Sequence, residues 1–231
     1  MSGNVRKIYS QRDKDIIFGF LKHAQELLPY KQNTYYTIPP LVGNIILPYY
    51  SAIEYFTDHG KGMEVCDNNY TCKNVSGRNT VYGAFQINNR DNYNILIWDF
   101  LLNIPNKDTI AVLGIDGSNK EYVDKSLSAS KLMYGWQCSL KFVSEERGNF
   151  YVGKGVGRGW STCNKYGGTY AKSNSRVRME IDVKNTTMKY FLNGEDQGIA
   201  TDDINFDGKS YYLAITFDEI ADVKLLDFLA L

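Results

Sequence analysis

Residues 176–200 read RVRMEIDVKNTTMKYFLNGEDQGIA. In the first half of this stretch, Val177, Met179, Ile181 and Val183 occupy every second position, and the residues between them are charged or polar. Side chains of a β-strand point alternately to its two faces, so a period of two predicts a strand with one apolar and one charged face. The stretch therefore predicts a strand that covers a core on one side and meets water on the other.

A second strand follows closely. Asn185-Thr186 predicts a turn, and MKYFL resumes the strand pattern before Asn193-Gly194. Asn-Gly is a strong signal for a two-residue hairpin turn, because both residues accept positive φ angles.

Further short strands are predicted on both sides of this hairpin. Downstream lie YYLAITF (211–217) and DVKLLDF (222–228), and upstream lie NILIWDF, TIAVLGI, WQCSLKF and NFYVGKGV. Many short strands at close spacing are typical of a β-sandwich. We expect a mainly β protein, an antiparallel β-sandwich over residues 80–231.

The region before the sandwich has a different pattern. Residues 1–56 predict a small helical segment, with apolar residues at helical spacing between Ser10 and Leu28 and again after Pro40. Residues 57–79 (TDHGKGMEVCDNNYTCKNVSGRN) are rich in Gly, Asn and Asp and predict a linker or long loop.

The composition argues against several functional classes. Lys and Arg total 26, as do Asp and Glu, so the net charge of the 231-residue chain is zero. A nucleic-acid or acidic-membrane binder usually has a basic surplus. No signal-peptide pattern begins the sequence, and the most apolar stretch, IPPLVGNIILPYY, is interrupted by proline. These features predict a soluble, intracellular (cytoplasmic) protein with no nucleic-acid or membrane partner.

The motifs of small-molecule chemistry are incomplete. The segment GNFYVGKG (148–155) has Gly155 where a phosphate-binding loop needs Ser or Thr, and no helix is predicted after it. Asp203, Asn205 and Asp207 match half of a calcium loop, but its twelfth position is Ala214. Four cysteines and two histidines lack the spacing of a zinc site or a nucleophile motif. We expect no cofactor, no metal and no catalysis.

At this point the second half of the chain resembles the SPRY (B30.2-type) domain family. The resemblance rests on RVRMEIDVKNTTMKYFLNGEDQGIA, on the closing strands YYLAITF and DVKLLDF, and on the earlier motifs YGWQCSLKF, NFYVGKGV and GWSTCNKYGG in the same order. It implies a SPRY/concanavalin-like sandwich and a non-catalytic adaptor that binds a short segment of a protein partner through loops at one end.

The resemblance also implies candidate contacts, in the loop after the Val-Gly strand and at the end of the penultimate strand. The expected roles are a charged donor, aromatic anchors, a cap for a partner amide and residues of the rim. The candidates are Arg158, Trp160, Tyr166, Tyr170, Thr216, Phe217 and Asp218. For Trp160, burial in the core is the alternative role.

Three alternatives stay open at this point. IPPLVGNIILPYY is similar to the opening helix of an F-box, which would make the protein a substrate receptor of a ubiquitin ligase. The N-terminal helices alternatively pack on the sandwich or mediate self-association. A sandwich of this class also hosts sugar-binding proteins, a function that fold alone does not assign.

Overall fold

The computed structural model describes residues 54–88, 93–106, 109–126, 129–138, 148–153, 162–167 and 170–231, except the side chains of Thr162 and Cys163. The described ranges belong to one compact unit, Tyr49–Leu231. The helices predicted before residue 54, with the F-box and self-association hypotheses, lie outside them. Within these ranges no helix has the length and apolar character needed to cross a bilayer.

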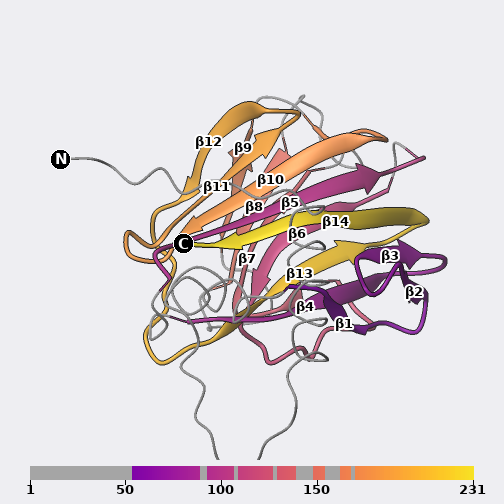
Figure 1. Ribbon diagram of the computed structural model, residues 1–231, viewed down its shortest axis with the longest axis horizontal. Coiled ribbons are helices and arrows are strands. Elements are labelled where there is room, and N and C mark those ends of the chain that lie inside the picture. The colour runs from indigo at the N-terminus through magenta and orange to yellow at the C-terminus, as the bar shows by residue number, and fades with distance from the viewer. Residues whose placement is uncertain are drawn as a thin grey trace, which may run out of the picture. The chain divides into compact units, whose positions relative to one another are not determined.

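The described residues form two seven-stranded antiparallel sheets that face each other as a sandwich (Figure 1). Sheet A has the order β1-β4-β13-β6-β7-β8-β9. Its strands are β1 (Phe56–His59), β4 (Asn79–Ile87), β13 (Tyr211–Phe217), β6 (Ala111–Asp116), β7 (Met133–Gln137), β8 (Gly148–Val152) and β9 (Thr162–Tyr166).

Sheet B has the order β12-β11-β10-β5-β14-β3-β2. Its strands are β12 (Glu195–Thr201), β11 (Thr187–Leu192), β10 (Ser175–Asp182), β5 (Ile95–Asn103), β14 (Ala221–Ala230), β3 (Thr71–Asn74) and β2 (Met63–Cys66). The predicted fold class, a mainly β sandwich, is confirmed.

The hairpin that opened the sequence analysis is β10–β11. Val177 pairs with Leu192 and Asp182 with Thr187, in unbroken antiparallel register. Buried and less buried residues alternate along both strands, as the period of two predicts. Asn193 and Gly194 have φ angles of 53° and 87°, so both are left-handed and form the tight turn into β12.

The prediction of a linker over residues 57–79 is wrong. This region contains most of β1, which pairs with β4 in sheet A. It also contains the hairpin β2–β3, in which β3 pairs with β14 in sheet B. Each of these strands has only four residues, too few for alternation to stand out from the surrounding Gly, Asn and Asp. The sandwich therefore begins before residue 57 rather than at residue 80.

Aromatic side chains join the two sheets in the core. The rings of Trp136, from β7, and Tyr190, from β11, have centroids 5.2 Å apart. The Tyr190 hydroxyl crosses from sheet B and donates to the carbonyl oxygen of Leu113 in sheet A, at 2.9 Å. At one edge of the sandwich the Tyr166 hydroxyl of β9 donates to the carbonyl of Gly198 in β12, at 2.6 Å.

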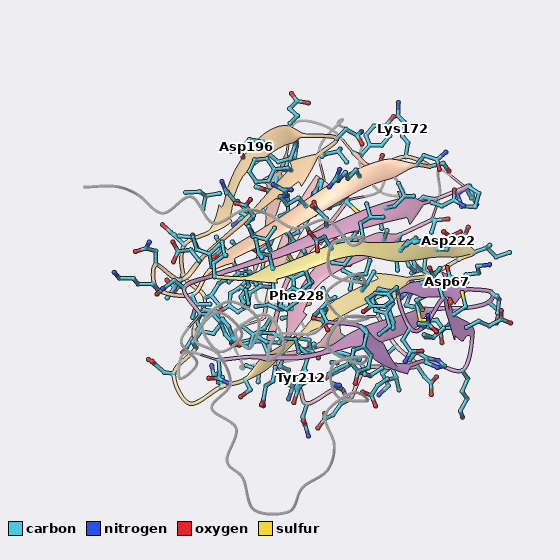
Figure 2. All side chains as sticks on the ribbon, in the orientation of Figure 1. Asp67, Lys172, Asp196, Tyr212, Asp222 and Phe228 are labelled. Atoms are coloured by element: carbon cyan, nitrogen blue, oxygen red, sulfur yellow. The ribbon has the colours of Figure 1, made fainter. Side chains whose placement is uncertain are left out.

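The outer face of sheet A is covered by the segment between β6 and β7. At its base, the buried Asp116 carboxylate accepts hydrogen bonds from the hydroxyls of Tyr82, Ser118 and Ser130. Burial raises the pKa of Asp116. Farther along, the Lys120 ammonium lies 4.5 Å from the ring centroid of Tyr212, a residue labelled in Figure 2. Both contacts attach the segment to the sheet.

Gly153, which follows β8, allows two backbone segments to approach closely. Its amide donates to the carbonyl of Met133, at 2.7 Å. A Cβ atom on residue 153 would lie 2.7 Å from the carbonyl carbon and oxygen of Lys131. The residue is glycine because a side chain would collide with this neighbouring main chain.

The outer face of sheet B carries paired charges. The Asp99 carboxylate of β5 accepts hydrogen bonds from Arg176 at 2.9 Å and from Arg178 at 2.9 and 3.0 Å. Burial by itself would raise the pKa of Asp99, but the two guanidinium groups outweigh it and hold the pKa below its ordinary value.

Replacing Tyr190 with Phe tests the hydrogen bond between the sheets. We expect Tyr190→Phe to lower the free energy of unfolding by about 1–2 kcal/mol, because the hydroxyl bond is lost in a buried site. Urea titration followed by circular dichroism measures this change. Tyr212→Phe is the control, since that ring lies on the outer face of sheet A. Equal stability of Tyr190→Phe and the wild type would show that the bond contributes nothing.

Replacing Asp99 with Asn tests the charge cluster. A carboxylate with a lowered folded-state pKa stabilises the fold above its unfolded-state pKa and loses this effect as the pH falls through the folded-state value. We expect Asp99→Asn to cost about 1–2 kcal/mol at pH 7. The difference should shrink as the pH falls below 3.8, the ordinary pKa of an Asp carboxyl group, toward the lower pKa of Asp99 in the folded state. A cost that does not depend on pH would contradict the ionic role.

Candidate functional site

The strand ends define two ends of the sandwich. At the Leu231 end, β4, β6 and β14 finish and β5 and β13 begin, as the pairs Tyr211↔Ile87 and Ala230↔Leu96 show. At the Ala221 end, β4, β6 and β14 begin and β5 and β13 finish. The pair Phe217↔Ala111, between the last residue of β13 and the first of β6, shows this. The C-terminus marks the Leu231 end in Figure 1, and Lys172 and Asp222 lie at the opposite end in Figure 2.

An open pocket of about 600 Å³ lies at the Leu231 end. We call it the loop pocket, because the connections β4–β5, β10–β11 and β12–β13 form it. Its lining residues are Tyr93, Asn94, Val183, Lys184, Thr186, Asp203, Ile204, Asn205, Phe206 and Asp207.

The segment before β13 forms one wall of the loop pocket. Its side chains alternate, with Ile204 and Phe206 buried and Asp203, Asn205 and Asp207 exposed. The apolar pair anchors the segment in the core, and the Phe206 ring meets the Tyr211 ring edge-on at 5.7 Å. This alternation directs polar side chains outward.

Two tyrosines of sheet A hold the backbone of this wall. The Tyr134 hydroxyl donates to the carbonyl of Asp203 and accepts from the amide of Asn205, both at 3.1 Å. The Tyr211 hydroxyl donates to the carbonyl of Asn205, at 2.7 Å. The Asn205 side-chain oxygen in turn accepts from the Asp207 amide, at 2.9 Å, which forms a local Asx turn.

Sheet B holds the same wall from the other side. The carbonyl of Thr186, in the β10–β11 turn, accepts from the amide of Ile204, and the Thr186 hydroxyl donates to the carbonyl of Asp202, both at 3.1 Å. The Val183 amide donates to the carbonyl of Asn94, at 2.8 Å. The three connections are thus bonded to one another as well as to the sheets.

Charges of both signs line the loop pocket. Lys184 is exposed on the β10–β11 side, and Asp203 and Asp207 are exposed on the opposite wall. Neither Lys184 nor Asp207 forms an ion pair with another described residue. Both therefore have charge available for a ligand.

A metal centre is not formed by the described residues. They contain no group of three or more His, Cys, Asp or Glu side chains placed to hold a metal ion. Ala214, at the twelfth position of the calcium-loop match, is buried within β13. The Asp-Asn-Asp pattern of 203–207 is instead the exposed side of a pocket wall.

Two of the predicted contact residues, Arg158 and Trp160, lie outside the described residues. The strands on either side of them do have positions: β8 ends at Val152 and β9 begins at Thr162, and these two residues pair with each other. Since Val152 also pairs with Tyr134 near the start of β7, β8 finishes and β9 begins at the Leu231 end.

Thr216 and Phe217 are not surface contacts, which corrects the expectation for both. Each is 0% exposed. The Phe217 side chain belongs to the core between the sheets. The hydroxyls of Thr216 and Thr80 are hydrogen-bonded at 2.6 Å on the other side of sheet A, under the β6–β7 segment. Phe217 is therefore a core residue and is not available as an aromatic anchor.

Asp218 has a role within the fold. Its carboxylate accepts from the amide of Ile110, and its own amide donates to the Ile110 carbonyl at 3.2 Å. Arg78 lies 3.8 Å from the same carboxylate. Asp218 thus caps a main-chain amide of this chain, where the prediction was a partner amide.

The two predicted rim tyrosines lie near the Ala221 end. Tyr166 is buried, and its hydroxyl is used in the bond to Gly198. Tyr170 is partly exposed, beside the Lys172 ammonium at 5.3 Å from its ring centroid. The predicted contact residues that the structure describes therefore all lie toward the Ala221 end, whereas the loop pocket lies at the Leu231 end.

Comparison with known proteins identifies the fold. No protein-family model and no curated protein matches the chain. The SPRY domain of human HERC1 matches with 16% identity and a TM-score of 0.53, over 74% of this chain and 97% of that domain. The PSpry domain of TRIM65 has 10% identity and a TM-score of 0.53, over 79% and 99%. A legume lectin-like domain from Entamoeba histolytica has 10% identity and a TM-score of 0.52, over 77% and 89%.

Tyr134→Phe tests how the wall of the loop pocket is held. The substitution removes a donated and an accepted hydrogen bond, each with a net value of about 1 kcal/mol. We expect hydrogen-exchange protection of the Asn205 amide to fall by about tenfold, with core amides of β6 unchanged. Tyr151→Phe, which removes a hydroxyl bonded to Gln137 elsewhere on sheet A, is the control. Unchanged protection at Asn205 would mean that Tyr134 does not hold the wall.

Proposed function

We propose that this chain, a SPRY-like β-sandwich, is a non-catalytic protein-interaction module that receives a short segment of a partner protein in the loop pocket. The observation that carries the proposal is the construction of the pocket. Three connections that are bonded to both sheets leave Lys184, Asp203 and Asp207 exposed around one concavity. Loops on a rigid scaffold are where binding residues concentrate.

The bonded walls favour binding of a flexible segment. A loop that is already ordered loses little conformational entropy when a ligand arrives, so more of the contact energy appears as affinity. Tyr134, Tyr211 and Thr186 provide this order from β7, β13 and the β10–β11 turn. The ordering cost then falls on the partner segment alone.

The side chains of the loop pocket suit recognition better than chemistry. Its lining residues include no His, Cys or Ser that would pair with a carboxylate as nucleophile and base. Asn94 and Asn205 offer amide groups for the main chain of an extended peptide, and the charged residues select among its side chains. The partner we propose is therefore a protein, bound through a short exposed stretch.

A sugar is the second candidate ligand. Carboxylate and amide groups beside Tyr93 provide acceptors, donors and a ring face, which hydroxyl-rich ligands also use. The fold is shared with the lectin-like domain from Entamoeba histolytica, at a TM-score of 0.52. The fold alone does not assign a ligand. The same pocket variants therefore test both candidate ligands, with protein capture as the assay for a peptide and a glycan array as the assay for a sugar.

A charge swap tests the proposed function. We expect Lys184→Glu with Asp207→Lys to reduce co-purification of the partner by tenfold or more, measured by affinity capture and quantitative mass spectrometry. Lys224→Glu with Glu195→Lys is the matched control, because these exposed residues lie on sheet B outside the pocket and the net charge is again unchanged.

Two outcomes would contradict the protein partner. Equal recovery of every captured protein by the pocket variant and the control would exclude the loop pocket as the protein-binding site. Binding of the wild type to a glycan array, lost in the pocket variant and kept in the control, would support the sugar candidate instead.

A further inference from the structure

A carboxyl group is buried where the chain enters the sandwich. Glu54 is 3% exposed and lies two residues before β1. The compact unit that contains the sandwich begins at Tyr49. Glu54 therefore belongs to the short stretch through which the chain passes into the two sheets.

Four N–H groups donate to this carboxyl group. One oxygen, Oε1, accepts from the amides of Tyr55 at 3.1 Å, Ala84 at 2.7 Å and Phe85 at 3.0 Å. The other, Oε2, accepts from the indole nitrogen of Trp98, at 2.9 Å. Since Ala84 and Phe85 belong to β4 and Trp98 to β5, the carboxyl group joins the entering segment to both sheets.

The surroundings of Glu54 are otherwise apolar. The Trp98 and Phe228 rings have centroids 5.0 Å apart, and those of Phe85 and Phe228 are 4.9 Å apart; Phe228 is labelled in Figure 2. A Cβ atom on residue 83 would lie 2.5 Å from Oε1, so glycine at this position makes room for the carboxyl group.

No cation balances a charge on Glu54 among the described residues. The acidic residues that the structure describes on the neighbouring strands do not contact Glu54. Asp99 of β5 forms ion pairs with two arginines on the outer face of sheet B, and Asp227 of β14 is the residue paired with Asp99 across the two strands. On β4, the Tyr82 hydroxyl is bonded to Asp116. Of the nearby tyrosines, Tyr55 is 37% exposed and the Tyr93 ring lies 5.7 Å from Phe85.

The two ionisation states of Glu54 have opposite advantages. An ionised carboxylate accepts all four N–H bonds but is buried without a counter-charge, which is costly. A neutral acid avoids that cost. Its own O–H proton, however, is surrounded by N–H donors and has no acceptor among the four hydrogen-bond partners. Burial dominates and raises the pKa of Glu54 to about 7, while the hydrogen bonds from Phe85, Trp98, Ala84 and Tyr55 oppose the rise.

We propose that Glu54 is a pH-sensitive latch, which holds residues 54–59 on the two sheets when the carboxyl group is neutral and loosens them when it ionises. The direction follows from linkage. A carboxyl group with a raised folded-state pKa stabilises the closed state fully below its exposed-state pKa, and the effect is lost as the pH rises through the folded-state value. The latch therefore loosens across the neutral range.

The size of the effect follows from the two pKa values. With 4.5 for an exposed Glu54 and about 7 for the closed state, the equilibrium constant for local opening rises about tenfold between pH 6 and pH 8. Opening exposes the amide of Phe56, which is bonded to Asn69, and the amides of Ala84 and Phe85. These three amides are the reporters of the latch.

Hydrogen exchange of the full chain at pH 6 and pH 8 tests the latch. After correction for intrinsic exchange rates, we expect protection of the Phe56, Ala84 and Phe85 amides to fall about tenfold at the higher pH. Amides in the centre of β6 should keep their protection. Glu54→Gln should abolish the pH dependence at the reporters, and Glu64→Gln, at an exposed glutamate of β2, should leave it intact.

Two results would overturn the latch. The first is protection at the reporters that does not change between the two pH values or that changes equally throughout the sandwich. The second concerns the titration itself and does not require a folded variant. If the Glu54 carboxyl carbon, followed by nuclear magnetic resonance in the wild type, titrates below pH 5, then ionisation at neutral pH does not change and the proposal fails.

Discussion

The contact between the inner faces of the two sheets, centred on Tyr190 and Trp136, is what the rest of the structure depends on. Burial of these faces removes the apolar half of each strand from water, which is the main favourable term in folding. The Tyr190 bond to Leu113 adds a direction to this packing, because it ties one strand of sheet B to one strand of sheet A. With the sheets held in this way, every strand end has a fixed place.

Buried polar groups then attach the connections to the sheets through hydrogen bonds. The chemical type of each group, hydroxyl or carboxyl, differs from one attachment to the next. Tyr134 and Tyr211 hold the wall of the loop pocket through their hydroxyl groups. Asp116 and Glu54 are carboxyl groups whose pKa values are raised by burial. Glu54 has N–H donors alone, whereas Asp116 accepts from three hydroxyls. The wall of the loop pocket and the segment before β1 are thus attached by different chemical groups, hydroxyls in the first and a buried carboxyl group in the second.

Strands β10, β11 and β13, each of six or more residues, were predictable from the sequence, because a strand of that length shows a recognisable pattern of apolar residues. β10 and β11 fall where alternation places them, β13 matches the strand predicted over residues 211–217, and the left-handed Asn193-Gly194 turn lies where the sequence indicates it. The four-residue strands β1, β2 and β3 were missed, because Gly, Asn and Asp around them obscure so short a pattern. The Asp203–Asp207 pattern was noticed but compared with a calcium loop, since nothing local shows that Ile204 and Phe206 anchor a pocket wall.

By itself, the sequence determined that strands with one apolar face pack into a sandwich, because alternation and turn residues act between near neighbours in the chain. Only the tertiary structure decided which side chains meet. It placed Phe217 in the core and brought Lys184 and Asp207 around one pocket. It also enclosed Glu54 among amides and an indole that lie 30 to 44 residues away in sequence. The physical reason is that such contacts depend on strand order and register across the whole sheet, which no local pattern encodes.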